Sequence, residues 1–292
     1  MVPDVSVVTP SLEQGRFIED CILSVMRQQG LDVEHVIQDG GSRDDTLEVM
    51  RRYDHVVKWA SEPDRGQSDA LNKALTKANG RWIAWQNADD FYLPGGLASL
   101  VRTGDRTGAD VVHGEVVGVD VGGKINRSVG HHNFKNRGTI SSLFFAQVVH
   151  SSGAIIRRSV LPPDPWEVTF RLIMDQEFFL KIASRGARFR FVRYPVAASR
   201  EHGDAMSLRS SPMAYVDEYT TKSDQYGVSS AGPLLGKSLH RVRKLVTGAY
   251  LRQYKMGRLR GRDLRWFRSE EGGTTFANVL RSCYGIAPPE LA

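Results

Sequence analysis

The sequence predicts an α/β protein whose mixed, mainly parallel sheet is flanked by helices. Two patterns predict this class. Apolar segments of strand length alternate with helix-patterned segments through residues 5–86, which is the order typical of a parallel sheet covered on both faces. A polar loop follows each of the four apolar segments, namely PSLEQG, DGGS, EPDRGQ and NADD. Because ligands bind at the carboxyl ends of parallel strands, we expect the four loops to border one site.

The individual elements of this first part follow from apolar periodicity and turn residues. Strands are expected at residues 5–9, 33–38, 55–61 and 81–86. Helices are expected at 16–29, from the DGGSRDD turn to about residue 53, and at 67–78. The first helix carries an apolar stripe around Cys21, which we interpret as a core thiol.

The pattern changes after Pro94. A helix at 95–107 leads to an alternating strand at 110–120 that turns back at VGGK, and further strands are expected at 152–160 and 188–198. An amphipathic helix is expected at 175–186. Residues 128–150 show no clear pattern, 204–233 are polar and irregular, and 234–268 indicate a basic helical region. We therefore expect an α/β domain over 1–210 and a basic helical region over 211–292.

Composition is that of a soluble globular protein. The 292 residues are enough for a full core, and 41% hydrophobic with 25% charged residues is ordinary. No apolar run approaches the roughly 18 residues needed to span a bilayer, and the N-terminus enters a strand pattern without a leader pattern. Cys21 and Cys283 share no motif and provide no disulfide framework, which fits a reducing cytoplasm. We expect a cytoplasmic protein.

The positive charge is concentrated near the C-terminus. Residues 237–268 hold 11 Lys or Arg and one acid, so this segment has a net charge of +10 and the rest of the chain has a net charge of −4. Within LLGKSLHRVRKLVTGAY, Leu235, Leu239, Val242, Val246 and Tyr250 lie near helical spacing, while Lys237, Arg241 and Lys244 lie elsewhere on the surface. A basic amphipathic helix is typical of binding to an anionic membrane surface, which we expect through 234–268. The alternative is a helix packed on the domain with a solvated basic face. Nucleic-acid binding is disfavoured, because there is no RNA-binding motif and no patterned stacking aromatic residues.

Two adjacent carboxylates, Asp89 and Asp90, follow the fourth predicted strand. Like charges side by side repel each other unless a cation neutralises them, and oxygen ligands suit Mg²⁺ or Mn²⁺. The alternative is a solvated turn in which an Asp caps the next helix.

Three stretches of the N-terminal third belong together: VSVVTPSLEQGRFIEDCILSVMRQQ, DGGSRDDTLEVMRRY and SEPDRGQSDALNKALTKANGRWIAWQNADDFYLPGGL. Through these stretches the chain resembles the family 2 glycosyltransferases of the GT-A fold. The order and spacing of the stretches agree over about residues 4–100, and the resemblance continues more thinly to about residue 210. It implies that 1–100 binds a nucleotide-diphospho-sugar and that 101–210 forms the acceptor side.

The resemblance also implies roles for single residues. Pro10 and Ser11 would border the base and ribose, and Asp39 would accept a hydrogen bond from the base. The remaining residues that would contact the nucleotide or donor sugar are Glu13, Arg65, Gln67, Asp69, Asn87, Ala88 and Asp89. For Asp39, Arg65 and Asp69 the alternatives are a turn carboxylate, a surface charge and stabilisation of a helix dipole, respectively.

The metal motif of the family lies at NADD, and this sequence departs from it. Asp89 stands at the last acidic position and Asp90 just after it, whereas Asn87 replaces the first acid. Glu13 stands where many relatives have Asn. In SREHGDAMS, His202 occupies a place where relatives often carry a His that binds the metal or the diphosphate; the alternative is a structural His. We therefore expect Mn²⁺ or Mg²⁺ at Asp89, Asp90 and His202.

In the family, an acid before an apolar-aromatic helix is the catalytic base, and Asp175 in RLIMDQEFFLKI matches it. An inverting transfer needs one carboxylate to take the proton of the acceptor hydroxyl, and a metal can stabilise the diphosphate leaving group. The alternatives are that Asp175 only caps the helix, or that Glu177 is the base. His131 and His132 lack a partner motif and are interpreted as a surface loop, and Trp85 as a core residue.

The expected function is therefore an inverting glycosyltransferase. The donor would be a UDP-, dTDP- or GDP-linked sugar, and the acceptor a glycan or glycolipid at the cytoplasmic face of the membrane. A different hypothesis, motivated by Asn87, is a catalytically degenerate sugar-nucleotide-binding or membrane scaffold protein. A nucleotidyltransferase is disfavoured, because no Gly-rich triphosphate loop with a following Lys lies near the first strand.

Overall fold

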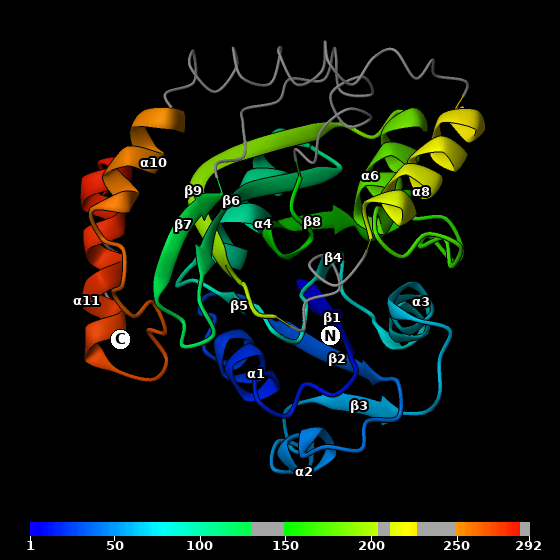
Figure 1. Cartoon of the computed structure of the whole chain (residues 1–292), viewed down its shortest axis with the longest axis horizontal. Helices are drawn as coiled ribbons and strands as arrows, with labels where there is room; N and C mark the ends of the chain where they lie inside the picture. Colours follow the sequence, from blue (N-terminus) through cyan, green and yellow to red (C-terminus); the bar gives the residue numbers. More distant parts are fainter. Residues whose placement is uncertain (130–148, 204–210, 227–248, 287–292) are drawn as a thin grey trace.

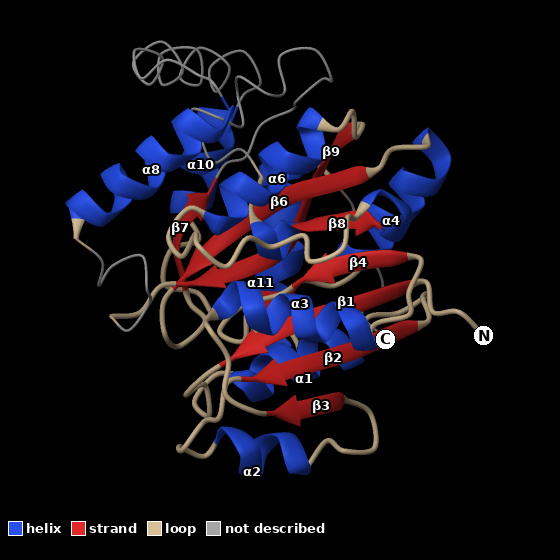
Figure 2. Cartoon of the chain, turned by 90° about the vertical axis from the view of Figure 1, so that its right-hand side faces the viewer, coloured by secondary structure: helices blue, strands red, loops and turns tan. Residues whose placement is uncertain are grey.

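The computed structural model describes residues 1–129, 149–203, 211–226 and 249–286. Its centre is a nine-stranded mixed sheet in the order β3-β2-β1-β4-β8-β6-β9-β5, with β7 paired to β6 (Figure 2). The strands are β1 (Val5–Ser11), β2 (Val33–Asp39), β3 (Lys58–Ser61), β4 (Trp82–Trp85), β5 (Phe91–Tyr92), β6 (Val111–Val119), β7 (Ile125–Val129), β8 (Ala154–Arg157) and β9 (Phe189–Arg200).

Strands β1 to β4 form the parallel part of the sheet, with β2 and β4 on either side of β1. Strand β8 then runs antiparallel to both β4 and β6, while β9 is parallel to β6. Strands β8 and β7 share one side of β6, because β8 pairs with Val111–His113 and β7 with Val116–Val119. The mixed, mainly parallel sheet predicted from the sequence is confirmed.

Helices cover both faces of the sheet, as the alternation of apolar side chains on β4 requires. Ile83 and Trp85 pack toward α3 (Gln67–Lys77) and α6 (Met174–Ser184). Trp82 and Ala84 pack toward α1 (Ile18–Met26) and α4 (Gly96–Thr107), and α2 (Thr46–Arg51) packs on α1. Cys21 is fully buried within α1, so its interpretation as a core thiol is confirmed.

The C-terminal helices pack on the far end of the sheet. They are α10 (Ala249–Gly257) and α11 (Glu270–Val279), and α11 continues into a π-helical turn at Leu280–Tyr284 (Figure 1). Met256, Phe267 and Phe276 share one apolar cluster with Phe91 of β5 and Ile125 of β7. The C-terminal residues therefore contribute to the core of the sheet. Among the described residues, no helix combines the length and apolarity that a membrane crossing requires.

Several predicted elements differ from the structure. The strand predicted at 55–61 is confined to Lys58–Ser61, and the strand predicted at 152–160 to Ala154–Arg157 between two short 3-10 turns. Residues 258–268 are not helical, so the prediction of a basic helical region is wrong for this part of the chain. His131, His132, Leu235, Leu239, Val242 and Val246 lie outside the described residues.

The clearest wrong prediction concerns residues 204–233, which were expected to be irregular. The described part of this segment is a 15-residue helix, α8 (Pro212–Tyr226). It was missed because α8 has no apolar stripe: tyrosines and long polar side chains make most of its contacts with α6. Proline at the first helical position is compatible with a helix start, since its missing N–H has no partner there in any case.

Candidate active site

The carboxyl ends of β1, β2 and β3 form one edge, as the sequence predicts. Ser11 pairs in register with Asp39, and Asp39 with Ser61, so that Pro10 and Ser11 end β1 rather than lie in the loop after it. The buried Asp39 carboxylate accepts hydrogen bonds from the backbone N–H groups of Gly41 and Ser42, both at 2.9 Å, and from Ser61 Oγ at 2.7 Å. Asp39 therefore holds its own turn; the contact with a base remains a prediction.

Glu13 bridges the loops after β1 and β2. Its backbone N–H donates to Ser42 Oγ at 2.7 Å, and its Oε1 accepts from the backbone N–H of Arg43 at 2.8 Å. Glu13 has φ of 54°, in the left-handed region where Asn is far better tolerated than Glu. This conformation would be easier for Asn than for Glu to adopt.

The start of α3 presents the next set of predicted residues. Gly66 has φ of 114°, which favours glycine, and it turns the chain between Arg65 and Gln67. The Asp69 carboxylate accepts from the guanidinium of Arg65 at 2.9 Å and from its backbone N–H at 3.1 Å. This bonding to Arg65 lowers the pKa of Asp69 despite its burial. Arg65 itself leaves 72% of its side chain exposed, and so it is accessible to a ligand.

The side chain of Asn87 joins α3 to the acidic doublet. Its Oδ1 accepts from Gln67 Nε2 at 2.9 Å and from Trp85 Nε1 at 3.0 Å, and its Nδ2 donates to Asp90 Oδ2 at 3.4 Å. A carboxylate could not donate to Asp90, so Asn at this position relieves a repulsion that Asp would create. Trp85 is buried in the core as predicted, and its indole N–H also orients Asn87. Ala88 is buried against α1 and α2.

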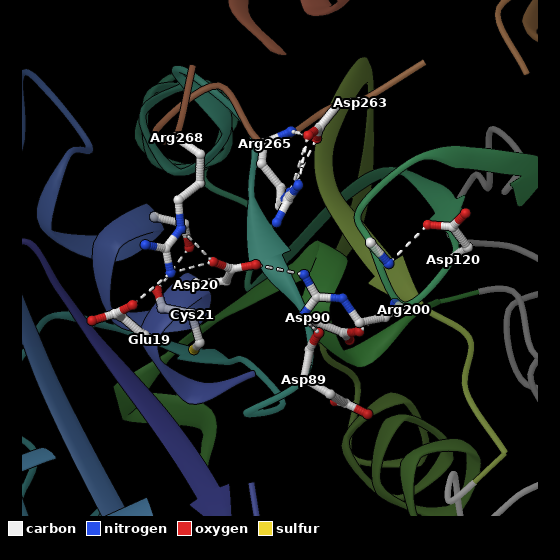
Figure 3. A network of polar contacts seen from close by, with 12 residues as sticks. Glu19, Asp20, Cys21, Asp89, Asp90, Asp120, Arg200, Asp263, Arg265 and Arg268 are labelled. Atoms are coloured by element: carbon white, nitrogen blue, oxygen red, sulfur yellow. Dashed lines mark hydrogen bonds and ion pairs between the residues drawn. The ribbon is translucent and has the colours of Figure 1, made fainter. Parts of the chain in front are cut away.

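The two carboxylates of the doublet point in different directions (Figure 3). Asp90 is buried, and its oxygens accept from Ser152 Oγ and, at 2.9 Å, from the backbone N–H of Arg200. Asp89 leaves 21% of its side chain exposed, and its Oδ2 lies 2.9 Å from Nε2 of His202. The doublet therefore provides one structural carboxylate and one that faces the site; the role of Asp90 as a metal ligand remains a prediction.

Arg200, the last residue of β9, holds the doublet in place. Its fully buried guanidinium donates to the backbone carbonyl of Asp89 at 2.9 Å and to Asp20 Oδ2 at 2.7 Å, and it lies over the rings of Phe17 at 4.8 Å and Phe91 at 5.5 Å. Asp20 also accepts from Arg268 at 2.8 Å (Figure 3). The loop is therefore tied to α1 and, through Asp20, to the C-terminal segment.

The electrostatics of the doublet follow from this arrangement. Burial and the neighbouring charge of Asp89 raise the pKa of Asp90 to about 7, against the hydrogen bonds from Ser152 and Arg200, which lower it. A proton on Asp90 removes the repulsion that two ionised neighbours would feel. The sequence predicts the repulsion; the structure shows which of the two carboxylates is removed from solvent.

Asp89 and His202 have the geometry of two neighbouring ligands of one cation. Ligand atoms about 2.1 Å from an ion and at right angles to each other are roughly 3 Å apart, close to the 2.9 Å between Asp89 Oδ2 and His202 Nε2. Within the described ranges there is no group of three or more His, Cys, Asp or Glu side chains that could hold a metal. A divalent ion here would therefore take its other ligands from water or from substrate oxygens, as Mg²⁺ often does.

Asp175 lies in the first turn of α6 and is partly exposed, with Oδ1 accepting from the backbone N–H of Gln176 at 2.7 Å. Ser68 Oγ of α3 lies 3.7 Å from Sδ of Met174, so α6 begins beside the first turn of the helix that carries Gln67. Glu177 is fully buried and bonded to Tyr226 and Lys181, and burial raises its pKa. Of the two acids, Asp175 is therefore the one that can meet a substrate.

Sequence reasoning missed the residues that support the doublet: Asp20, Ser152, Arg200 and Arg268. Asp20 offered a signal, because it is a charged residue beside the apolar stripe of a helix and needs a buried partner. Arg200 stands two residues before His202, at the end of an apolar strand, which is an equally unusual place for a charge.

Comparisons with known proteins identify what this arrangement resembles. Residues 6–162, more than half of the chain, match the model of the family described as Glycosyl transferase family 2. A PGL/p-HBAD biosynthesis glycosyltransferase of Mycobacterium bovis (strain BCG / Pasteur 1173P2) is 28% identical over 211 residues, which are 69% of this chain and 78% of the relative.

Solved structures of two proteins, among others, are similar in fold. S. aureus TarS 1-349 in complex with UDP matches with a TM-score of 0.57 and 20% identity over 68% of this chain and 61% of that chain, less than two thirds of its length. The structure of TarS 1-349 in complex with UDP-GlcNAc matches with a TM-score of 0.60 and 14% identity, and the match covers 96% of this chain and 81% of that chain. Mannosyltransferase PcManGT from Pyrobaculum calidifontis, in complex with GDP-Man and Mn²⁺, matches with a TM-score of 0.54 and 17% identity. This match covers 98% of this chain and 88% of that chain. These likenesses show the predicted GT-A fold.

Replacing Arg200 tests its support of the doublet. Arg200→Gln leaves the Asp20 carboxylate and the Asp89 carbonyl without their buried donor, which typically costs about 3–5 kcal/mol of unfolding free energy. We expect a matching loss in urea unfolding, and a several-fold weaker stabilisation by Mn²⁺ with UDP or GDP. Arg193→Gln, at an exposed position of the same strand, is the control. Equal stability of Arg200→Gln and Arg193→Gln would refute this role.

Proposed function

Because the chain belongs to glycosyl transferase family 2, we propose that it transfers a sugar, with inversion, from a nucleotide-diphospho-sugar to a hydroxyl group of a glycolipid or polysaccharide. The observation that carries this proposal is the Asp89–His202 pair, a partly exposed carboxylate beside a buried imidazole, set on a buried Asp90–Arg200 support at the carboxyl edge of the sheet. A pair of ligands presented in this way suits an ion that also binds a diphosphate.

The donor is a UDP-, dTDP- or GDP-linked sugar. TarS is known in complex with UDP and UDP-GlcNAc, and PcManGT with GDP-Man. In this chain, Pro10, Ser11 and Asp39 form the base side of the proposed site. Ser11 Oγ is buried and has no hydrogen-bond partner within the described residues, so a hydrogen bond to a ligand would replace none within the fold. Gln67 begins α3 and Arg65 lies in the turn before it, where an exposed guanidinium suits a phosphate.

Asp89 and His202 would hold Mn²⁺ or Mg²⁺, and the ion would stabilise the negative charge that develops on the departing diphosphate. The support beneath them keeps their positions fixed before the donor arrives. Asn87 and Arg200 orient the loop, and the carboxyl group of Asp90 lies inside the protein rather than in the site. Fixed dipoles and charges of this kind lower a barrier because they need no reorganisation during the reaction.

Asp175 would take the proton from the acceptor hydroxyl as that oxygen attacks the anomeric carbon. The contact between Met174 and Ser68, the residues next to Asp175 and Gln67, supports this assignment. The hypothesis of a degenerate scaffold was motivated by Asn87, and the structure provides another reason for that residue: its amide donates to Asp90. Asn87 is therefore compatible with an active enzyme.

Asp175→Asn tests the proposed base. The substitution keeps the size of the side chain and removes its ability to accept a proton, so turnover should fall by about 10²–10⁴-fold. Binding of Mn²⁺ with UDP or GDP, measured by calorimetry, should stay within twofold of wild type. Asp224→Asn, at an exposed position of α8, is the control. Wild-type release of nucleoside diphosphate by Asp175→Asn would remove Asp175 from the mechanism.

We propose in addition that the protein binds the cytoplasmic face of the membrane through the exposed side of α10. Leu251 and Tyr254 are 59% and 64% exposed, beside the exposed Lys255 and Arg258. Aromatic and aliphatic side chains flanked by basic residues suit an anionic bilayer surface. The other basic residues of this region are partly used inside the protein: Arg252 pairs with Glu115 at 2.7 Å, and Arg268 with Glu19 at 2.7 Å.

Point substitutions test this surface better than a deletion, because removal of the C-terminal residues would also take Met256 and Phe276 out of the core. Lys255→Gln with Arg258→Gln should weaken binding to phosphatidylglycerol vesicles by about 30-fold, since each basic residue near an anionic leaflet contributes about 1 kcal/mol. Val56→Gln, at an exposed position remote in sequence, is the control. Unchanged partitioning of the double variant would contradict the membrane proposal.

A further inference from the structure

One polar face of α8 contacts the beginning of α6, the helix that carries Asp175. Glu218, Lys222 and Tyr226 are spaced four residues apart and so lie on one side of α8. Their side chains reach the residues before α6, Gln176 and Glu177, respectively. We propose that Glu218 and Lys222 are positioning residues for the Asp175 carboxylate, an inference that rests on the proposed function. Glu218 fixes the start of α6, and Lys222 places a cation beside Asp175.

Glu218 binds the backbone that leads into α6, up to its N-cap residue. The N-cap residue of α6, Ile173, has no side-chain cap of its own. Glu218 Oε1 accepts from the backbone N–H of Arg171 at 3.0 Å, and Oε2 accepts from those of Leu172 and Ile173 at 2.9 and 3.1 Å. Backbone donors at a helix start have no partner within the helix, and a carboxylate there is also favoured by the helix dipole. The chain that enters α6, two residues before Asp175, is therefore held by a side chain from another helix.

Lys222 is a buried amine next to the proposed base. Its side chain is fully buried, Nζ donates to Gln176 Oε1 at 2.7 Å, and Nζ lies 3.9 Å from the centre of the Tyr219 ring. The ionisable groups that act on it are Asp175 and Glu177 of α6. Burial lowers the pKa of Lys222 to about 7, while these two carboxylates act to raise it.

A buried lysine is costly unless its charge is paired. The negative charges that offset part of this cost lie on α6, and one of them is Asp175. The attraction is mutual, so a protonated Lys222 favours the ionised form of Asp175, which is the form that can accept a proton. Among the other neighbours, Tyr215 and Tyr219 of α8 pack against the aromatic core around α6, and Tyr226 donates to Glu177 at 3.0 Å.

The experiment compares Glu218→Gln and Lys222→Met with Asp217→Asn, an exposed carboxylate on the same helix. Release of nucleoside diphosphate is measured with Mn²⁺ and the UDP-, GDP- or dTDP-linked sugar that the wild-type enzyme turns over. For both variants we expect kcat to fall by tenfold or more, with KM for the donor within twofold. For Lys222→Met the acidic limb of the kcat profile should move upward by at least half a pH unit, because loss of the cation makes the neighbouring carboxylate easier to protonate.

A purely structural role would give a different pattern. It would lower the unfolding temperature and the active fraction without moving the pH profile, and this result would overturn the proposal, as would unchanged kcat. If Lys222→Met does not fold, Lys222→Arg and Glu218→Asp provide the same test: Arg should keep the wild-type acidic limb, and the shorter Asp should lower kcat.

Asp175→Asn, assayed in parallel, separates this inference from the proposed function. If Asp175→Asn keeps wild-type turnover, the assignment of the base fails, and the positioning role fails with it. If Asp175→Asn is inactive and the two α8 variants equal Asp217→Asn, only the positioning role is overturned. In the Asp175→Asn background, Lys222→Met should cause no further loss of the residual rate; an additional tenfold loss would show that Lys222 acts independently of Asp175.

Discussion

The buried guanidinium of Arg200 is the interaction on which the candidate site depends. It binds the backbone of Asp89 and the carboxylate of Asp20, while the backbone N–H of the same residue binds Asp90. Burying these charges has a large desolvation cost, which is offset only when every partner is well placed. The loop after β4 is consequently held in one conformation, with Asp90 inward and Asp89 outward beside His202. Arg200 and His202 lie two residues apart, so the strand that supports the acidic loop also delivers the proposed second ligand.

The C-terminal segment takes part in the same arrangement. Arg268 reaches Asp20 and Glu19 on α1, and the apolar residues of α10 and α11 complete the core around β5 and β7. On the other side of the sheet, α8 supports α6 through Glu218 and Lys222. Segments that follow the family match at residue 162 therefore support both halves of the candidate site: the acidic loop and the proposed base. Within the described C-terminal residues, Arg252 and Arg268 form ion pairs with the rest of the protein, while Lys255 on α10 is exposed.

The strands and helices of residues 5–86 could be predicted because each of them has a clear apolar period and a turn at its end. Strand β5 could not, since two residues, Phe91 and Tyr92, are too few to show a period. Helix α8 could not, since polar side chains make its contacts. The sequence also could not predict that Asp90 is buried while Asp89 is partly exposed. The two residues are identical neighbours in a turn, and the backbone of Arg200, 110 residues further along the chain, binds only the carboxylate of Asp90. Candidate residues were recognisable by their type and place, whereas their supports come from distant segments.

The central claim is that Asp89 and His202 hold a divalent ion against a diphosphate, and pulsed electron paramagnetic resonance of bound Mn²⁺ tests it most directly. The spectrum is recorded for the protein with Mn²⁺ and UDP or GDP, and again for His202→Phe. We predict a ¹⁴N coupling from a directly bound imidazole, together with ³¹P coupling from the diphosphate, and loss of the ¹⁴N coupling in the variant. A Mn²⁺–nucleotide complex that binds without ¹⁴N coupling in the unaltered protein would contradict the account.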